Sequence, residues 1–123
     1  MSDHDNGGIV TAFCDAWTNH DVEAIVESFT DDAVYHNIPM DPIEGKVAIE
    51  AVIRGFLGGS RISFETTHQV AEGDIVMNER LDTITTDDRA VAVPVMGVFV
   101  MRDGKIAEWR DYFDLATFTG SGD

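Results

Sequence analysis

The chain has 123 residues, of which 44% are hydrophobic, and this size suits one compact domain with a core of its own. Lys and Arg number 8 against 23 Asp and Glu, which gives a formal net charge of -15. Such an acidic balance argues against a nucleic-acid or anionic-membrane surface, because phosphate groups bind to basic patches.

The cysteine content and the N-terminus bear on the cellular compartment. Cys14 is the single cysteine, and it lies in an amphipathic helical pattern where we expect a small core residue. One cysteine allows no disulfide within the chain, which fits a reducing compartment. The N-terminus MSDHDNGG lacks the basic start and apolar core of a signal peptide, and no apolar run approaches the length of a membrane span. We therefore expect a single cytoplasmic domain over residues 1–123, with flexible tails at residues 1–7 and 119–123.

The first half of the chain carries apolar residues at helical spacing. This pattern predicts a helix over residues 8–19. Asp21 is a suitable N-cap for a second helix, whose apolar face extends to Phe29. A third helix is expected to begin after Gly45 and to end at Gly58.

After the third helix the apolar residues alternate with a period of two. Residues 61–70 and 75–86 flank the loop AEGD, and residues 89–101 and 105–115 flank the loop RDG, so both pairs are predicted β-hairpins. The earlier segment 33–40 is expected to be a short strand or an extended loop. The order of elements predicts an α+β fold, in which N-terminal helices pack on a curved antiparallel or mixed sheet.

A carboxylate interrupts the apolar face of the last predicted strand, EWRDYFDL. Alternation places Asp111 in one row with Ala107, Trp109, Phe113 and Leu115. Burying an unpaired carboxylate costs several kcal/mol or forces it to take up a proton. We therefore expect Asp111 to have a partner.

Arg80 is the best candidate for that partner. It is two residues from Asp82 in the predicted strand IVMNERLDTITT, so the two side chains share a face of the sheet. By itself this pair could be an ordinary surface ion pair. If Asp111 joins it, two carboxylates share one guanidinium and are expected to retain a proton near neutral pH. One carboxyl group is then an acid and the other a base in the same pocket.

Tyr35 and Asn37 are a second candidate pair, because they share a face of the extended segment VYHNIP. A phenol and an amide that project together can hold a water molecule or a substrate oxygen, although a plain pair at a strand end is an equally simple interpretation. The four histidines form no metal-spaced cluster, and the chain has no phosphate loop, nucleophile elbow or zinc motif.

Four segments together resemble limonene-1,2-epoxide hydrolase: YxN at 35–37, ERLD at 79–82, GVF at 97–99 and GKIAEWRDYFDLATF at 104–118. The resemblance covers the chain from about Thr11 to Phe118. It implies the cone-shaped α+β fold that this family shares with ketosteroid isomerase and the SnoaL-like polyketide cyclases.

The resemblance also implies a role for each residue of the set. Asp111 would be the general base that deprotonates a water molecule, and Tyr35 and Asn37 would hold that water in line with the epoxide carbon. Asp82 would be protonated and would donate its proton to the epoxide oxygen, and Arg80 would bridge the two carboxylates. The expected partners are a small lipophilic epoxide and water, with no metal and no cofactor, and the expected assembly is a homodimer.

An apolar lining is expected around this set. Its predicted members are Met77 (or Val76, because both rows of that strand mix apolar and polar residues), Val93, Val95, Trp109, Phe113 and Phe118. Two alternatives remain, a SnoaL-like cyclase or isomerase of the same fold and a non-catalytic lipophile-binding protein. The complete Asp–Arg–Asp set favours an enzyme, because two carboxylates on one arginine cost stability without helping to hold an apolar ligand.

Overall fold

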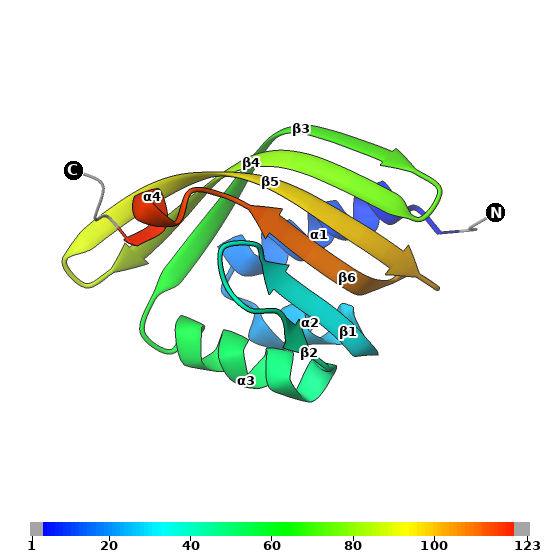
Figure 1. Ribbon diagram of the computed structural model, residues 1–123, viewed down its shortest axis with the longest axis horizontal. Helices are drawn as coiled ribbons and strands as arrows, with labels where there is room; N and C mark the ends of the chain where they lie inside the picture. Colours follow the sequence, from blue (N-terminus) through cyan, green and yellow to red (C-terminus); the bar gives the residue numbers. More distant parts are fainter. Residues whose placement is uncertain (1–3, 120–123) are drawn as a thin grey trace.

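The computed structural model describes residues 4–119 and confirms the predicted α+β architecture (Figure 1). In chain order the elements are α1 (Asn6–Thr18), α2 (Val22–Glu27), β1 (Phe29–Asn37), β2 (Ile43–Glu44), α3 (Lys46–Leu57), β3 (Arg61–Glu72), β4 (Ile75–Thr86), β5 (Arg89–Arg102), β6 (Lys105–Tyr112) and α4 (Leu115–Thr119). None of the helices in this part of the chain is long and apolar enough to cross a membrane.

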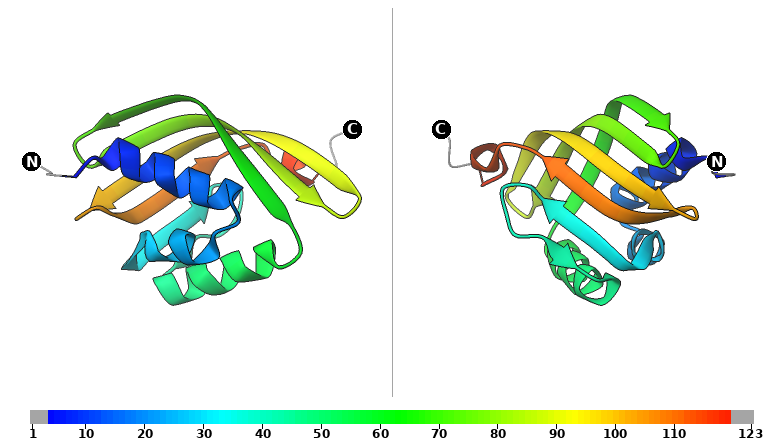
Figure 2. Two further views of the ribbon diagram at one scale, coloured as in Figure 1. Left: turned by 180° about the vertical axis from the view of Figure 1, so that it is seen from behind. Right: turned by 45° about the vertical axis from the view of Figure 1, so that its right-hand side comes forward.

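The strands form one mixed, curved and unclosed sheet in the order β2-β1-β6-β5-β4-β3. All neighbouring strands are antiparallel except β1 and β6, which run parallel. Helices α1, α2 and α3 lie on one side of the sheet, as the view from behind shows (Figure 2). The face that they cover is called the inner face below, and the opposite face is called the outer face.

Local sequence signals explain the ends of the helices. The side chain of Asp5 accepts a hydrogen bond from the Gly8 amide, and the side chain of Asp21 accepts one from the Ala24 amide. Both are N-caps, which satisfy amides that have no partner inside the helix. The expectation for Asp21 is therefore confirmed. However, α2 ends at Glu27, so Phe29 begins β1 instead of lying on the apolar face of that helix.

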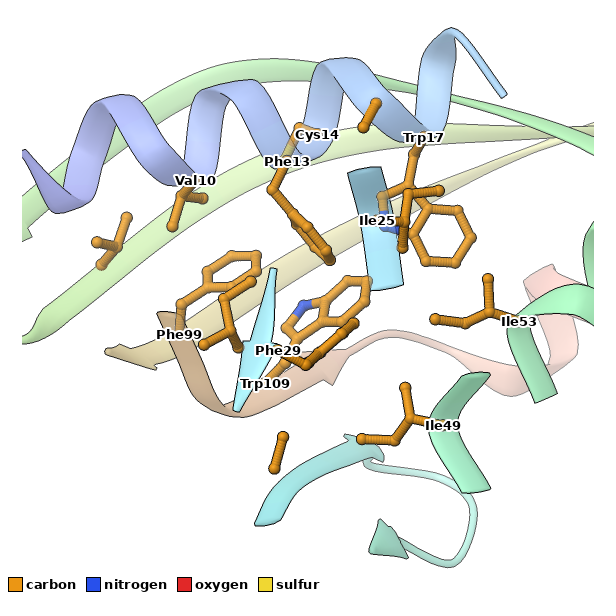
Figure 3. Close-up of a cluster of buried hydrophobic side chains, with 14 of the residues drawn as sticks. Val10, Phe13, Cys14, Trp17, Ile25, Phe29, Ile49, Ile53, Phe99 and Trp109 are labelled. Atoms are coloured by element: carbon orange, nitrogen blue, oxygen red, sulfur yellow. The ribbon is translucent and has the colours of Figure 1, made fainter. Parts of the chain in front are cut away.

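The core lies between the helices and the inner face, and aromatic rings dominate it (Figure 3). The ring of Phe13, from α1, makes edge-to-face contacts with Trp17, Phe29, Phe99 and Trp109, with centroids 5.0–6.3 Å apart. Such pairs stabilise a core beyond the area that they bury. This packing holds α1 against β5 and β6, which carry Gly97 and Asp111 of the site described below.

The predicted strand over residues 105–115 is correct in place but not in detail. The β5–β6 pairing shifts between Val100 and Met101, so a bulge leaves Ala107 half-buried and turns Ile106, not Ala107, into the core. An extra residue of this kind reverses the alternation on one side of the bulge. The strand ends at Tyr112, and Leu115 begins α4 with an exposed side chain.

Some residues of the segments expected to be tails belong to helices in the structure. Asn6 and Gly7 belong to α1, and Thr119 belongs to α4. Residues 1–3 and 120–123 lie outside the described residues.

Candidate active site

One cross-strand row of the sheet brings together residues from four strands. Asn78 on β4 pairs with Gly97 on β5, and Gly97 pairs with Asp111 on β6. Asn37 on β1 pairs with Asp111 from the other side, in the parallel ladder. Directly opposed residues point to the same face of a sheet. The register therefore places Asn37 beside Asp111 on the inner face.

Arg80 extends from β4 and joins the two carboxylates as predicted. Its Nε donates to Asp82 Oδ1 at 3.0 Å, and one terminal nitrogen donates both to Asp82 Oδ2 and to Asp111 Oδ2, each at 2.8 Å. The guanidinium also lies over the ring of Phe64, with 4.5 Å to the centroid. Arg80 is 2% exposed, Asp82 5% and Asp111 4%, so the group forms a buried ionic cluster.

Asp111 has more hydrogen-bond donors than Asp82. Its Oδ1 accepts a short hydrogen bond of 2.6 Å from Trp109 Nε1, and it also receives a longer contact of 3.4 Å from Arg80. Asp82 accepts only from Arg80 among the described residues. Because donors stabilise the ionised form of a carboxyl group, hydrogen bonding favours the charged form of Asp111 more than that of Asp82.

Burial controls the protonation of the cluster. It raises the pKa of Asp82 to about 6, although the hydrogen bonds and charge of Arg80 act in the opposite direction. Burial also raises the pKa of Asp111, against the effects of Arg80 and Trp109. Two carboxyl groups that share one cation titrate as a pair, so the cluster retains a proton closer to neutral pH than a surface carboxyl group would.

Gly97 leaves the space that the guanidinium occupies. A Cβ atom at this position would lie 2.4 Å from a terminal nitrogen of Arg80, 2.9 Å from Asn78 Oδ1 and 2.9 Å from Asp111 Oδ1. Real Cβ atoms do not come so close to other atoms. The side chain of Arg80 can therefore cross the β5 backbone only because residue 97 has no side chain.

Tyr35 and Asn37 lie at the β1 side of the same cluster. Tyr35 pairs with Trp109 and stacks on its indole, with 4.2 Å between centroids and 6° between planes. Burial and the nearby charge of Asp111 raise the pKa of the phenol, so Tyr35 remains a neutral O–H donor. Its stacking fixes the ring, while Asn37 is held by the ladder beside Asp111.

A mostly apolar cavity of about 280 Å³ opens onto this cluster. Four polar residues of the predicted set line it: Tyr35, Asn37, Asp82 and Asp111. Three further predicted lining residues, Val93, Val95 and Phe113, also lie in its wall. A pocket in which few polar groups converge within apolar walls is typical of a small-molecule site.

Two predicted lining residues do not line this cavity. Met77 lies on the outer face and is 38% exposed, because β4 turns its even-numbered residues inward; Val76, the alternative, is fully buried in the core. Trp109 is fully buried, and its role is to stack on Tyr35 and to donate to Asp111. Phe118 belongs to α4, but its side chain lies outside the described residues.

Helices α1 and α3, the loop after β1, and strands β2, β3 and β4 supply lining residues that the sequence pattern did not indicate. They are Trp17, Met40, Asp41, Ile43, Val52, Ile53, Phe56, Ile62, Phe64 and Ile84. An apolar stripe on a helix predicts burial but does not distinguish core from cavity wall. In residues 4–119 no group of three or more His, Cys, Asp or Glu side chains is placed to hold a metal ion.

Comparison with known proteins identifies the family. The family model of the SnoaL-like domain matches residues 10–109. The chain belongs to the SnoaL-like family. It is 36% identical to the epoxide hydrolase EphG of Mycobacterium tuberculosis over 108 residues, which cover 86% of this chain and 71% of EphG.

Solved structures agree with this assignment. An LEH-like epoxide hydrolase of M. tuberculosis superposes with a TM-score of 0.86 at 32% identity, over 94% of this chain and 87% of the other. These similarities confirm the predicted resemblance to the limonene-1,2-epoxide hydrolases. An NTF2-like protein of unknown function from Burkholderia pseudomallei has a TM-score of 0.84 at 15% identity, over 95% of this chain and 96% of the other, and shows the fold alone.

The close approach at Gly97 yields a prediction about stability. We expect Gly97→Ala to lower the free energy of unfolding by about 1–3 kcal/mol, because the new methyl group must displace the guanidinium or the backbone. Gly55→Ala is the matched control: it lies on the exposed side of α3 with no atom near the new Cβ. That substitution should raise stability by about 0.5–1 kcal/mol, through helix propensity. Urea denaturation of both variants measures the difference, and equal stabilities would contradict the tight packing at Gly97.

Proposed function

We propose that this protein is an epoxide hydrolase that adds water to a small lipophilic epoxide in one step and uses no metal or cofactor. One observation carries the proposal: a buried Asp82–Arg80–Asp111 cluster faces an apolar cavity beside Tyr35 and Asn37. The similarity to a protein named epoxide hydrolase supports it. Water is a poor nucleophile and an alkoxide is a poor leaving group, so the reaction needs a base and an acid at one site.

Asp111 is the proposed base. Its Oδ1 is engaged by Trp109 and Arg80, whereas Oδ2 accepts one hydrogen bond, from Arg80. Oδ2 therefore has a lone pair available for a proton from water. Asn37 and Tyr35 are placed to orient that water, with the amide beside Asp111 and the phenol as a neutral donor. Such positioning converts an encounter with bulk water into attack by one oriented molecule.

Asp82 is the proposed acid. As the water oxygen bonds to an epoxide carbon, the C–O bond of the ring breaks and the proton of Asp82 passes to the departing oxygen. Asp111 gains the proton that the water loses. The pair must then return one proton from Asp111 to Asp82 before the next turnover, and their shared contact with Arg80 keeps them close enough to do so.

The walls of the cavity support a lipophilic substrate. Apart from the polar set, its wall is aliphatic and aromatic, with contributions from α1, α3 and β3 to β5. Asp41, in the loop between β1 and β2, is the further charged residue of the lining. A volume of about 280 Å³ lies near the lower end of the range for ligand pockets, which favours a small epoxide.

A single turnover in heavy-oxygen water tests the one-step reaction. With enzyme in excess over epoxide, direct attack places the label in the first diol formed and leaves the protein unlabelled. An ester intermediate would give an unlabelled first diol and would deposit the label in an aspartate side chain. Mass spectrometry of the diol and of the peptides that contain Asp82 and Asp111 distinguishes the routes. If no epoxide of a varied panel gave a diol, the proposed function itself would be wrong.

The three charged residues should act as one unit. We expect Asp82→Asn and Asp111→Asn each to lower kcat by about 10³-fold or more, with the double variant little worse than either, because both groups serve one proton-transfer step. Arg80→Lys should be similarly severe, since an ammonium group cannot bridge two carboxylates with a planar fork. Asp32→Asn on the exposed part of β1 is a control that should retain activity. If the loss of kcat in the double variant equalled the product of the two single losses, the two groups would not share one step.

We further propose that the protein is a homodimer that buries the outer face of the sheet. Apolar side chains line up across the strands there, with Met77 between Val70 and Val98 and with Met96 beside Tyr112. Several of them are substantially exposed in the single chain. Exposed apolar patches of this kind mark interaction surfaces, and a second copy presents a complementary patch.

Light scattering tests this assembly. The wild type should have twice the chain mass of 13.5 kDa, and Met77→Lys should shift it toward that single mass, because a buried lysine without a partner opposes association. Val47→Lys on α3, where the side chain is 85% exposed, is the control and should leave the mass unchanged. A dimeric Met77→Lys variant would place the interface elsewhere, and a monomeric wild type would overturn the dimer.

A further inference from the structure

A chain of hydrogen bonds continues from Arg80 away from the two carboxylates. The second terminal nitrogen of Arg80 donates to Asn78 Oδ1 at 2.9 Å. Asn78 Nδ2 in turn donates to Gln69 Oε1 at 3.2 Å. Gln69 Nε2 donates to the Gly7 carbonyl at 3.0 Å and to Thr11 Oγ1 at 3.1 Å, both on α1. The chain therefore connects the first helix to the charged cluster.

From this chain we propose that Asn78 is a positioning residue of the epoxide hydrolase reaction, a role that rests on the proposed function. Asn78 is fully buried, and it is not among the residues that line the cavity, so it acts through Arg80 and not on the substrate. It fixes the plane of the guanidinium and so determines how strongly Arg80 engages each carboxylate.

The orientation of the Asn78 amide follows from its partners. If the amide were turned by 180°, its NH₂ group would face the N–H donor of Arg80, and its oxygen would face Gln69 Oε1, which is also an acceptor. Both contacts would then lack a correct donor–acceptor match. Gln69 is held in turn, because its NH₂ group has two acceptors on α1. The cross-strand pairing of Gln69 with Asn78 brings the two amides together on the inner face.

Asn78 keeps the contact between Arg80 and Asp111 Oδ1 long. The nitrogen that donates to Asn78 at 2.9 Å is 3.4 Å from Asp111 Oδ1. Without the amide oxygen, that nitrogen would be a buried donor with Asp111 Oδ1 as its nearest acceptor. A rotation toward Asp111 would add a strong charged hydrogen bond to the proposed base and make it less basic.

The choice of an amide over a carboxylate also matters. Asp82 and Asp111 already share one cation, and a third carboxylate at position 78 would compete with them for it. The three carboxyl groups would then hold more protons at a given pH. A neutral acceptor positions the guanidinium and leaves the proton count of the pair unchanged.

Two isosteric variants separate these effects. We expect Asn78→Leu, which removes the acceptor, to lower kcat by about tenfold or more and to change KM by less than about threefold, since the residue does not contact substrate. We expect Asn78→Asp to move the acidic limb of the pH–rate profile to higher pH by about one unit, because it adds a negative charge beside Arg80. Asn19→Asp, the same change at the exposed end of α1, should leave the profile unchanged.

A readout that needs no activity distinguishes this role from the proposed function. The carboxyl carbons of Asp82 and Asp111 can be titrated by NMR in the wild type and in Asn78→Asp, and the variant should titrate at higher pH. Gln69→Leu removes the acceptor that holds the Asn78 amide, so it should lower kcat by a smaller factor than Asn78→Leu does. This variant replaces Asn78→Leu in the test if Asn78→Leu does not fold. Wild-type kcat in the acceptor-deficient variants, or unshifted carboxyl titrations in Asn78→Asp, would overturn the role of Asn78. Absence of diol from the wild type, with shifted carboxyl titrations in Asn78→Asp, would overturn the proposed function and leave the effect of Asn78 on the two carboxyl groups standing.

Discussion

The buried guanidinium of Arg80 is the constraint on which the site depends. A cation that is 2% exposed must have its hydrogen-bond donors satisfied inside the protein, and Asp82, Asp111 and Asn78 satisfy them. Asp82 and Asn78 lie on β4 with Arg80 itself, and Asp111 lies on β6. The same burial that makes the cluster costly also raises the carboxyl pKa values, so the stability cost and the capacity for proton transfer have a single origin.

Strand register turns this cluster into a site. The inner face of the sheet carries Asn37, Asp111, Gly97 and Asn78 in one row, and Tyr35, Trp109, Phe99 and Val76 in the next. Asn37 and Asp111 of the first row line the cavity together with Tyr35 of the second, whereas Trp109, Phe99 and Val76 are buried in the core behind it. Because β1 joins β6 in parallel, Tyr35 and Asn37 lie beside Asp111 on the side opposite to Arg80. A shift of one residue in that ladder would turn both toward the outer face.

Much of this could be predicted from sequence, since alternation in β4 and β6 is sufficient to pair Arg80 with Asp82 and to mark Asp111 as a buried carboxylate. Alternation could not decide between Met77 and Val76, because both rows of β4 mix polar and apolar residues and only the packing against the helices selects the inner row. It also could not reveal the bulge at Ala107, which depends on the pairing with β5. The donor role of Trp109 was hidden for a different reason: an indole in an apolar row predicts packing, and its N–H has meaning only once the position of Asp111 is known.

The placement of α1 shows how the fold and the site are coupled. The first half of this helix holds Gln69 through Gly7 and Thr11. Phe13 near its centre packs against Trp109, which donates to Asp111. The helix thus reaches the cluster by a polar route through Asn78 and by an apolar route through the aromatic core. A motion of α1 would disturb both carboxylate supports at once, because the two routes end on Arg80 and on Asp111. Rigid packing of aromatic rings around a polar cluster is therefore a requirement of the site, since proton transfer between groups held by one guanidinium tolerates little displacement.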